Sequence, residues 1–321
     1  MSSASRGLLV LQAGIGTMIQ DLGRPGYRRY GVTRSGAMDP LALQIANCLV
    51  GNPFDTPCIE LNISGADFRV TTDSLRCAFH GGDFTLDING LPAPVSTSLH
   101  LRQGDIISIN SARQRIRGYL AVEGGFELEP VLGSCATHVR SALGGLDGGP
   151  LEAGQELICL QELAPARKEV SLPYMLFPKT RRQFRVILGP QADRFTAEGI
   201  YTFLNTTAFR IDKDSDSMGY RLAGKRLEYL GDGNIVSDPV VPGCVQVPAS
   251  GHPLILMADC PTTGGYPKIA TVISTDLPDL AQLPPGAEVS FRSVSLEEAH
   301  IARQKRQHWL AKLPNQLITL D

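Results

Sequence analysis

The chain has 321 residues, of which 43% are apolar, so it is long enough for about two domains of ~150 residues, each with its own core. Its 30 basic and 32 acidic residues give a formal net charge of −2, which excludes the strongly basic surface of a protein that binds nucleic acid or an anionic membrane. No apolar run approaches the ~20 residues of a transmembrane helix, and the apolar stretch 7–11 is too short for a signal-peptide core. We therefore expect a cytoplasmic protein.

The chain begins with a predicted strand at 8–11 and continues with a helix after Asp39. Asp39 is a good N-cap, Pro40 suits the first helical position, and Gly51 suits the position just past the helix end. The apolar residues between these points recur at helical spacing, which predicts one buried face made of Leu41, Ile45, Ala46, Leu49 and Val50.

Most of the remaining chain is predicted to form short strands, because glycine (33) and proline (22) are frequent and spread throughout. Residues 84–88 alternate apolar and polar, and Asn89–Gly90 directly after them is the strongest short signal for a hairpin. Two strand-like stretches within 99–109 flank Gln103–Gly104–Asp105. Further apolar runs predict buried strands at 118–122, 184–188, 245–247, 254–257 and 269–274.

A stretch without clear periodicity, 166–182, contains prolines and is basic at its end, so we expect a linker there. It would separate an N-terminal β-rich domain, 1–165, from a C-terminal domain, 183–321. The C-terminal domain has a predicted helix within 193–204 and a terminal helix from Ser295 to about Lys312. Ser295 and Glu298 form a capping box at the start of that terminal helix.

The cysteines and histidines show no metal-binding pattern. Seven cysteines are scattered without a C-x-x-C pair, which predicts free thiols in a reducing compartment. The six histidines have no H-x-x-x-H or H-x-x-E-H spacing. Asp212, Asp214 and Asp216 alternate as in a calcium loop, but the glycine and the terminal glutamate of that loop are missing. We therefore predict no metal site.

Two familiar catalytic patterns are absent or incomplete. There is no G-x-S-x-G elbow. Ser35 lies just before a helix N-terminus, where backbone N–H groups can face an anion, but the local sequence alone favours an ordinary turn serine. Residues 219–226 approach the phosphate-binding pattern G-x-x-x-x-G-K-[ST], but Arg226 replaces the hydroxyl residue and no helix pattern follows. We interpret that segment as a false match.

Glycine-rich polar clusters remain, and such loops let backbone amides approach a ligand closely. Arginine is suited to a bidentate grip on a carboxylate, so Arg24, Arg221 and Lys268 are candidate anion holders. The alternative is that the clusters are tight turns with solvated charges. The clusters are 20–26, 140–149, 217–221 and 262–268.

The clusters occur together with other short motifs in one order along the chain. These motifs are GTMIQDLGRPG (16–26), GV (31–32), SGAMD (35–39), ANCLVGN (46–52), RGYLAV (117–122), GG (124–125), LGS (132–134), MGYRL (218–222), PGCVQVP (242–248), TTGGYPK (262–268) and the stretch 276–282. The ordered set, spanning 8–309, resembles the biotin-dependent carboxyltransferase, or allophanate hydrolase subunit 2, family. Within that family it is most similar to the C subunit of 5-oxoprolinases, the Kip-antagonist type.

The resemblance implies a mainly β fold with a few helices, built from cyclophilin-like β-barrel domains. It implies a complex with two partner proteins, one of the lactam-utilisation type (the A subunit) and one of the Kip-inhibitor type (the B subunit). That complex converts 5-oxoproline to glutamate with ATP, which we expect a partner to bind or share. Two alternatives stay open: a carboxyltransferase component of a biotin-dependent urea or amide carboxylase, and a non-catalytic regulator that binds a Kip-inhibitor-type partner.

Under the enzymatic hypothesis, the chain is one component of an ATP-dependent lactam hydrolase and places the substrate carboxylate and a phosphorylated intermediate by charge. No lysine lies in an Ala-Met-Lys-Met setting, so any biotin would arrive on a partner. His80 lies where the sequence departs from the family pattern and is given no role. The expected catalytic residues are Asp21, Arg24, Arg221 and Lys268, with Asp21 orienting Arg24 or accepting a proton. The expected substrate-binding residues are Gln20, Ser35, Tyr220, Gln246, Thr262, Thr263, Gly264, Gly265 and Tyr266.

Overall fold

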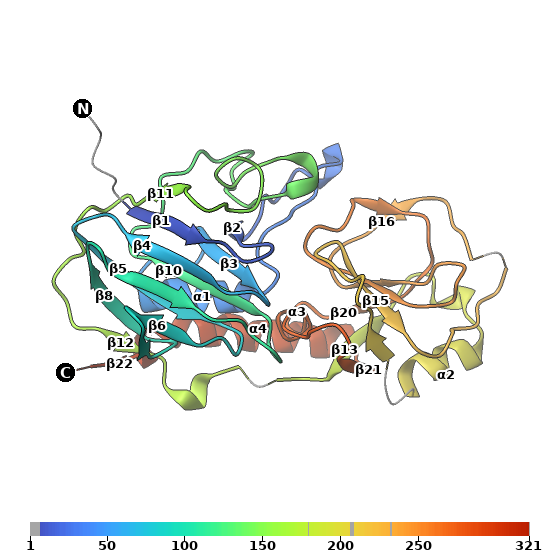
Figure 1. The fold of residues 1–321 in the computed structure, drawn as a ribbon. Coiled ribbons are helices and arrows are strands. Elements are labelled where there is room, and N and C mark those ends of the chain that lie inside the picture. The colour runs from blue at the N-terminus through green and yellow to red at the C-terminus, as the bar shows by residue number, and fades with distance from the viewer. Residues whose placement is uncertain (1–6, 179, 206–208, 232, 321) are drawn as a thin grey trace. The chain divides into compact units, whose positions relative to one another are not determined.

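The computed structural model describes residues 7–178, 180–205, 209–231 and 233–320. Its contacts divide the chain into two compact units, each formed by separate stretches of sequence (Figure 1). Unit 1 contains Met1–Arg24, Asp39–Pro178 and Leu310–Asp321, whereas unit 2 contains Pro25–Met38 and Lys179–Trp309.

Unit 1 is built from two antiparallel β-sheets around one hydrophobic core (Figure 1). Apolar side chains of both sheets meet in that core, among them Val10 and Phe68 from the first sheet and Ile59, Phe79 and Leu120 from the second. The first sheet has the order β11 (Glu156–Ile158), β1 (Gly7–Gln12), β4 (Ala66–Val70), β9 (Ile106–Ile109), β6 (Leu86–Ile88) and β7 (Leu91–Ala93). The second has the order β2 (Met18–Gln20), β3 (Cys58–Asn62), β10 (Arg117–Val122), β5 (Ser74–His80) and β8 (Ser98–Arg102).

The strands predicted in unit 1 are confirmed. β6 and β7 form a hairpin through Asn89 and Gly90, whose φ values of 53° and 78° are the positive pair that a tight primed turn requires. The two strands flanking 103–105 also exist as β8 and β9, but they belong to different sheets. The turn between them therefore carries the chain from one sheet to the other.

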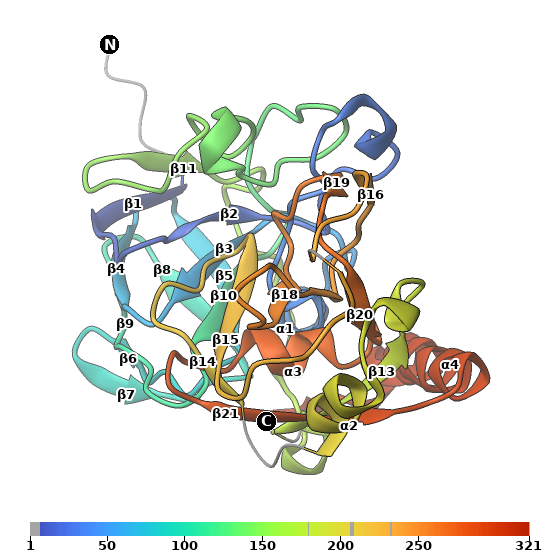
Figure 2. The ribbon, with the colours of Figure 1, turned by 90° about the vertical axis from the view of Figure 1, so that its right-hand side faces the viewer.

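Unit 2 is built around a closed barrel (Figure 2). Its strands follow the order β13 (Gln183–Leu188), β20 (Lys268–Val272), β17 (Cys244–Gln246), β18 (Leu254–Leu256), β15 (Gly219–Ala223), β14 (Phe209–Ile211) and β21 (Glu288–Ser293). β13 and β21 close the barrel as a parallel pair, with Phe184 opposite Phe291. The prediction of a mainly β fold with a barrel is confirmed.

The helices begin where the sequence predicted their caps. α1 (Pro40–Leu49) is capped by the Asp39 carboxylate, which accepts a hydrogen bond from the Ala42 amide at 2.9 Å. At the start of α4 (Leu296–Lys312), Ser295 and Glu298 exchange two hydrogen bonds of 2.8 and 3.1 Å. α2 (Ala197–Asn205) lies close to the predicted range. α3 (Leu277–Ala281) was not predicted, because it is too short for an apolar pattern to repeat.

The stretch 166–182, expected as a linker, is shared between the units, and its part up to Pro178 belongs to unit 1. There β12 (Val170–Ser171) pairs with β22 (Ile318–Thr319), and Leu172 is buried. The physical reason is that this short irregular stretch obtains partners from residues remote in sequence, which no local pattern reveals.

Residues 25–38, expected in the N-terminal domain, belong instead to unit 2. The Arg28 guanidinium donates to the carbonyl oxygens of Val240 and Pro261 at 2.5 and 2.7 Å. The Thr33 hydroxyl donates to the carbonyl of Cys260 at 2.9 Å. These bonds hold the segment against the 240–261 stretch of unit 2.

The second sheet of unit 1 is covered on both faces, because all residues of β5 and β10 are buried. One face of these strands meets the hydrophobic core, and α1 packs against both strands. The side chains that alternate with the core residues include charged and polar ones: Arg76 and His80 on β5, and Arg117 and Tyr119 on β10. Such groups must find hydrogen-bond partners inside the protein, since no water reaches them.

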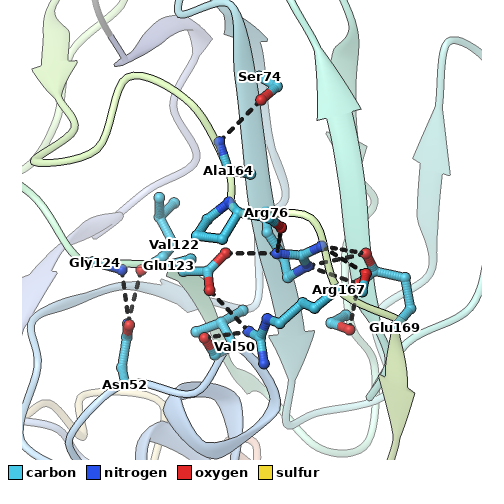
Figure 3. Close-up of polar contacts among 12 residues, drawn as sticks. Val50, Asn52, Ser74, Arg76, Val122, Glu123, Gly124, Ala164, Arg167 and Glu169 are labelled. Carbon is cyan, nitrogen blue, oxygen red and sulfur yellow. Dashed lines mark hydrogen bonds and ion pairs between the residues drawn. The ribbon is translucent and has the colours of Figure 1, made fainter. Parts of the chain in front are cut away.

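Arg76 shows how this requirement is met (Figure 3). Its Nη1 donates to Glu123 at 2.7 Å and to the carbonyl of Pro165 at 2.9 Å. Its Nη2 donates to the carbonyl of Arg167 at 3.1 Å and lies 2.9 Å from Glu169, to which Nε also donates. All five N–H groups of the guanidinium thus have acceptors. The network ties the stretch 165–169 to β5.

Replacing Arg76 with Met would leave Glu123 and Glu169 without their buried counter-charge. We expect Arg76→Met to lower the free energy of unfolding by about 3–5 kcal/mol, as for other broken buried ion pairs. Urea denaturation followed by circular dichroism measures this loss. Arg102→Met on β8 is the matched control, because Arg102 is exposed, and it should change stability by less than ~0.5 kcal/mol. Equal losses in the two variants would contradict the assignment.

His80 lies on the same face and is held neutral. Burial, with a smaller contribution from the charge of Arg115, lowers the pKa of His80 from 6.5 to about 3. Its Nδ1 lies 2.8 Å from the Ser96 hydroxyl. In the unfolded chain the imidazole would regain its ordinary pKa, so the unfolded state binds a proton that the folded state does not between about pH 3 and 6.5.

Stability should therefore fall as the pH is lowered below about 6.5, with His80 contributing up to ~1.4 kcal/mol per pH unit. His80→Gln keeps a group that can bond Ser96 and removes the titration, so its unfolding free energy should depend less on pH between 6.5 and 4. Denaturation curves for both proteins across that range measure the difference. Parallel pH profiles would show that His80 does not contribute.

Candidate functional site

One polar cluster of unit 2 surrounds Lys268, the first residue of β20. Its side chain is only 3% exposed, and its ammonium donates to the Asp238 carboxylate and, at 3.2 Å, to the carbonyl of Pro239. Asp238 and Pro239 form β16, which pairs with β19 (Thr263–Gly264); Figure 2 shows the two strands side by side. The 262–266 loop is thus linked through β16 to the lysine.

Gln191 completes the support of this ion pair. Its Nε2 donates to Asp238 at 3.2 Å, and its Oε1 accepts from the backbone amide of Lys268 at 3.2 Å. The Lys268 ammonium and, to a lesser degree, the Gln191 amide hold the pKa of Asp238 below its usual range. Asp238 is therefore ionised near neutral pH, and its carboxylate balances the buried ammonium.

Gln246 on β17 lies directly beside Lys268 in the strand register. It is buried, and its Nε2 donates to the carbonyl of Tyr266 at 3.4 Å. A side chain at Gly264 would place a Cβ 2.3 Å from that Nε2, so the Gln246 amide would have to move away from the loop. We call the set Gln191, Asp238, Gln246, Gly264, Tyr266 and Lys268 the Lys268 cluster.

The rest of the 262–266 loop contributes through its backbone. The carbonyl of Thr262 accepts from the Val240 amide at 3.1 Å, and that of Gly265 accepts from the Ile235 amide at 2.9 Å. Thr263 is exposed at the surface. The loop is held in place by its backbone while this polar side chain faces solvent.

The chemistry available to the Lys268 cluster is the binding of an oxyanion. A buried ammonium interacts strongly with negative charge because little water screens it. The side chain of its counter-ion Asp238 is 41% exposed, so the ion pair borders solvent on the Asp238 side.

Tyr220 and Arg221 follow one another on β15 and point to opposite sides. Tyr220 is part of the barrel core, and its hydroxyl donates to the carbonyl of Ala281 at 3.1 Å. Arg221 is exposed and lines a cavity of about 280 Å³. Within the described residues, no hydrogen bond or ion pair joins Arg221 to the Lys268 cluster.

Ser35, also in unit 2, adopts a left-handed backbone with φ 54°. Its hydroxyl donates to the Asp259 carboxylate at 2.6 Å. This bond adds to those of Arg28 and Thr33 in holding the segment 25–38.

The three predicted residues of unit 1 come together around the stretch 131–137. Asp21 accepts from the hydroxyl of Ser134 and the amide of Cys135, both at 2.7 Å. Arg24 is fully buried and donates to the carbonyl of Ala136 and, at 3.4 Å, to that of Val131. Gln20 donates to the carbonyl of Thr137 at 3.0 Å. These side chains support a loop, and their expected part in catalysis stays a prediction.

Sequence reasoning missed two polar groups. Asp238 and Gln191 lie 30 and 77 residues from Lys268, and no local motif connects them.

The second missed group lies in unit 1. Glu60 pairs with Arg117 at 3.1 Å and accepts a hydrogen bond from the Tyr119 hydroxyl at 2.7 Å. That hydroxyl in turn accepts a hydrogen bond from the Asp39 amide at 2.8 Å. Burial, reinforced by the charge of Glu60, raises the pKa of Tyr119 well above its usual value. The detectable signal was Arg117, a charged residue directly before the predicted buried strand 118–122.

The thiols are poor candidates for catalysis. All seven cysteines are free and buried. Burial raises the pKa of Cys48 and Cys260 to about 11 and that of Cys77 and Cys159 to about 12, which disfavours the reactive thiolate.

Across 7–178, 180–205, 209–231 and 233–320, the acidic, histidine and cysteine side chains form no group suited to a metal ion. Nor does any helix in these ranges have the length and apolarity to cross a bilayer.

Comparison with known sequences places most of the chain in one family. Residues 30–293 match the model described as the carboxyltransferase domain, subdomain A and B. The chain is 34% identical to the C subunit of 5-oxoprolinase from Escherichia coli, over 95% of this chain and 97% of that protein. It is 37% identical to the C subunit of 5-oxoprolinase from Haemophilus influenzae, over 92% and 94% of the two chains. Urea amidolyase of Lachancea kluyveri is 30% identical over 93% of this chain but only 17% of its own length.

Solved structures share the fold. The urea amidolyase of Kluyveromyces lactis superposes with a TM-score of 0.90 at 25% identity, covering 98% of this chain and 20% of that one. The protein TTHA0988 superposes with a TM-score of 0.77 at 33% identity, covering 92% of this chain and 56% of that one. The chain thus spans only part of these longer proteins but nearly all of the two 5-oxoprolinase subunits. It belongs to the carboxyltransferase-domain family.

Proposed function

We propose that the chain is the C subunit of an ATP-dependent 5-oxoprolinase, an enzyme that opens the lactam of 5-oxoproline to give glutamate. One observation carries this proposal: two proteins named as the C subunit of 5-oxoprolinase are 34% and 37% identical to the chain and match it over nearly their full lengths. The urea amidolyases of Lachancea kluyveri and Saccharomyces cerevisiae are 30% and 28% identical, and the matching region is 17% of each of these longer chains.

Both relatives are named as subunits, which supports a role within a complex. We propose that the two partners are a protein of the lactam-utilisation type and a protein of the Kip-inhibitor type. ATP would be bound by a partner or shared with one, since no segment of this chain fits a phosphate-binding loop.

The Lys268 cluster suits the chemistry of this reaction. A lactam is a poor electrophile because its nitrogen donates electrons into the carbonyl, and transfer of a phosphoryl group to the amide oxygen would remove that resistance. The substrate carboxylate and the phosphorylated oxygen are both anions, and a buried ammonium fixed in advance is an effective partner for either. Lys268 would bind the anion as Asp238 gives way, with Gln246, Thr262 and Thr263 as hydrogen-bond donors.

The remaining expected site residues take supporting roles in this proposal. Asp21, Arg24 and Gln20 would keep the loop 131–137 in its working shape, and Ser35 would do the same for the segment 25–38. Gly264, Gly265 and Tyr266 would place the loop beside Gln246. Tyr220 would act through the barrel core, because its hydroxyl is committed to Ala281.

Reconstitution tests the proposal directly. The chain is mixed with its two candidate partners and ATP, and glutamate release from 5-oxoproline is measured with each component left out in turn. We expect turnover only in the complete mixture and co-purification of this chain with the Kip-inhibitor-type partner. Turnover that is unchanged without this chain would overturn the proposal. Tight association without any turnover would favour the regulatory alternative.

The carboxyltransferase alternative is favoured by the TM-score of 0.90 with the urea amidolyase of K. lactis. Its test is the transfer of a carboxyl group from carboxylated biotin on a carrier protein to urea. We expect this transfer to stay at background in a mixture that hydrolyses 5-oxoproline. Transfer that depends on this chain would replace the first proposal by the second.

Substitution of Lys268 is the most direct test of the Lys268 cluster. We expect Lys268→Met to reduce turnover of the reconstituted complex by about 10²–10³-fold, the usual cost of losing one fixed charge that stabilises an anion. The unfolding midpoint should change little, since Asp238 can return to water. Lys305→Met on α4 is the matched control, because Lys305 is exposed, and it should keep full activity. Full activity of Lys268→Met in a complex that contains it would remove Lys268 from the site.

A further inference from the structure

We propose that the cavity on the outer side of β15 binds a zwitterionic α-amino acid, with its carboxylate on Arg221 and its ammonium on Asp212. The cavity has a volume of about 280 Å³. That is slightly below the ~300–1,000 Å³ of sites for drug-sized ligands and suits a small metabolite. Its apolar lining includes Ala223, Pro248 and Leu254, and its polar lining residues are Asp212, Arg221, Ser250 and His252.

Arg221 supplies a positive charge from a fixed backbone. Its amide donates to the Ser215 hydroxyl at 3.1 Å, and its carbonyl accepts from the Asp212 amide at 2.8 Å. Its neighbours Tyr220 and Leu222 lie in the barrel core, so the Arg221 side chain projects outward. Among the described residues its guanidinium has no hydrogen bond and no ion pair, which leaves its paired donors available to a carboxylate.

Asp212 supplies the opposite charge. The bond from its amide to the Arg221 carbonyl continues the pairing of β14 with β15 and brings the two residues side by side. One carboxylate oxygen of Asp212 accepts from the Asp214 amide at 2.9 Å. No ion pair joins Asp212 to Arg221 within the described chain. The cavity therefore presents one positive and one negative group that do not neutralise each other.

His252 forms the third polar group, and its position is fixed by the ladder between β15 and β18. Arg221 lies opposite Leu254, and the Leu222 amide donates to the Pro253 carbonyl at 2.9 Å, which continues the register by one residue. Continuing it once more places His252 opposite Ala223 and diagonal to Arg221, at about 7–8 Å. The small side chain of Ala223 leaves room above it. The Nδ1 atom of His252 is buried and has no partner among the described residues.

The opposite charges of Arg221 and Asp212 restrict the kind of ligand that the cavity can bind. A simple anion would be held by Arg221 but repelled by Asp212, and a simple cation would meet the reverse. An α-amino acid carries both charges on neighbouring atoms and satisfies both side chains at once. Its own side chain would extend toward His252, where a polar or acidic group finds a hydrogen-bond partner. An acidic amino acid such as glutamate therefore fits the lining best.

The inference stands apart from the proposed function, because binding is measured on the chain alone and hydrolysis on the complex. Proton NMR of the histidine rings follows the full-length protein during titration with glutamate, and His252→Gln identifies the His252 signal. We expect glutamate to shift that signal saturably and acetate or inorganic phosphate to leave it in place. Arg221→Ala and Asp212→Asn should each weaken glutamate binding by at least about tenfold, a loss of ~1.4 kcal/mol for each broken contact.

Asp212→Asn keeps the oxygen that accepts from the Asp214 amide, so it removes charge while preserving the turn. Arg210→Ala is the matched control, since Arg210 is an exposed arginine on the adjacent strand and pairs with Glu288 at 3.3 Å. It should bind glutamate as the unaltered protein does. An equal shift with acetate or phosphate would overturn the proposal in favour of a plain anion site. The absence of a His252 shift, or unchanged binding in Arg221→Ala, would overturn it outright.

Discussion

Burial of the second sheet of unit 1 on both faces is the constraint on which the rest of that unit depends. Polar groups on its outer face have no water to bond, so each must be matched by the protein itself. Arg76 obtains this match from Glu123, Glu169 and two backbone carbonyls, and His80 obtains it by staying neutral. The same hydrogen bonds also hold other segments in place. The bond from Arg76 to the Pro165 carbonyl holds the stretch 165–169, and the bond between Tyr119 and the Asp39 amide holds the start of α1.

The two sites of unit 2 use charge in opposite ways. In the Lys268 cluster the ammonium and the Asp238 carboxylate already neutralise each other, so the proposed anion would have to displace Asp238 and would bind by exchange. In the cavity beside β15, Arg221 and Asp212 are adjacent, and no ion pair joins them in the described chain, so a ligand that carries both charges binds by addition.

The sequence alone predicted the structural features that depend on interactions between residues close together in the chain. Asn89–Gly90 predicted a turn, and Asp39 and Ser295 with Glu298 predicted helix starts, because each signal acts within four residues. It was insufficient wherever partners lie far apart. The bond from Arg76 to Glu169 spans 93 residues and that from Arg28 to Pro261 spans 233, and no periodicity encodes either. For the site, Lys268 was predicted from its glycine-rich surroundings and Gln246 from the family resemblance, whereas Asp238 and Gln191 required the folded chain.

The path of the chain has a consequence for how the molecule is made. The backbone leaves unit 1 after Arg24, returns at Asp39, leaves again after Pro178 and returns at Leu310. The segment 25–38 is therefore synthesised long before the barrel against which it is held, and β12 must wait for β22 near the end of the sequence. Unit 1 therefore cannot be completed until the chain after Leu310 has been synthesised, and unit 2 cannot be completed until synthesis has reached Trp309.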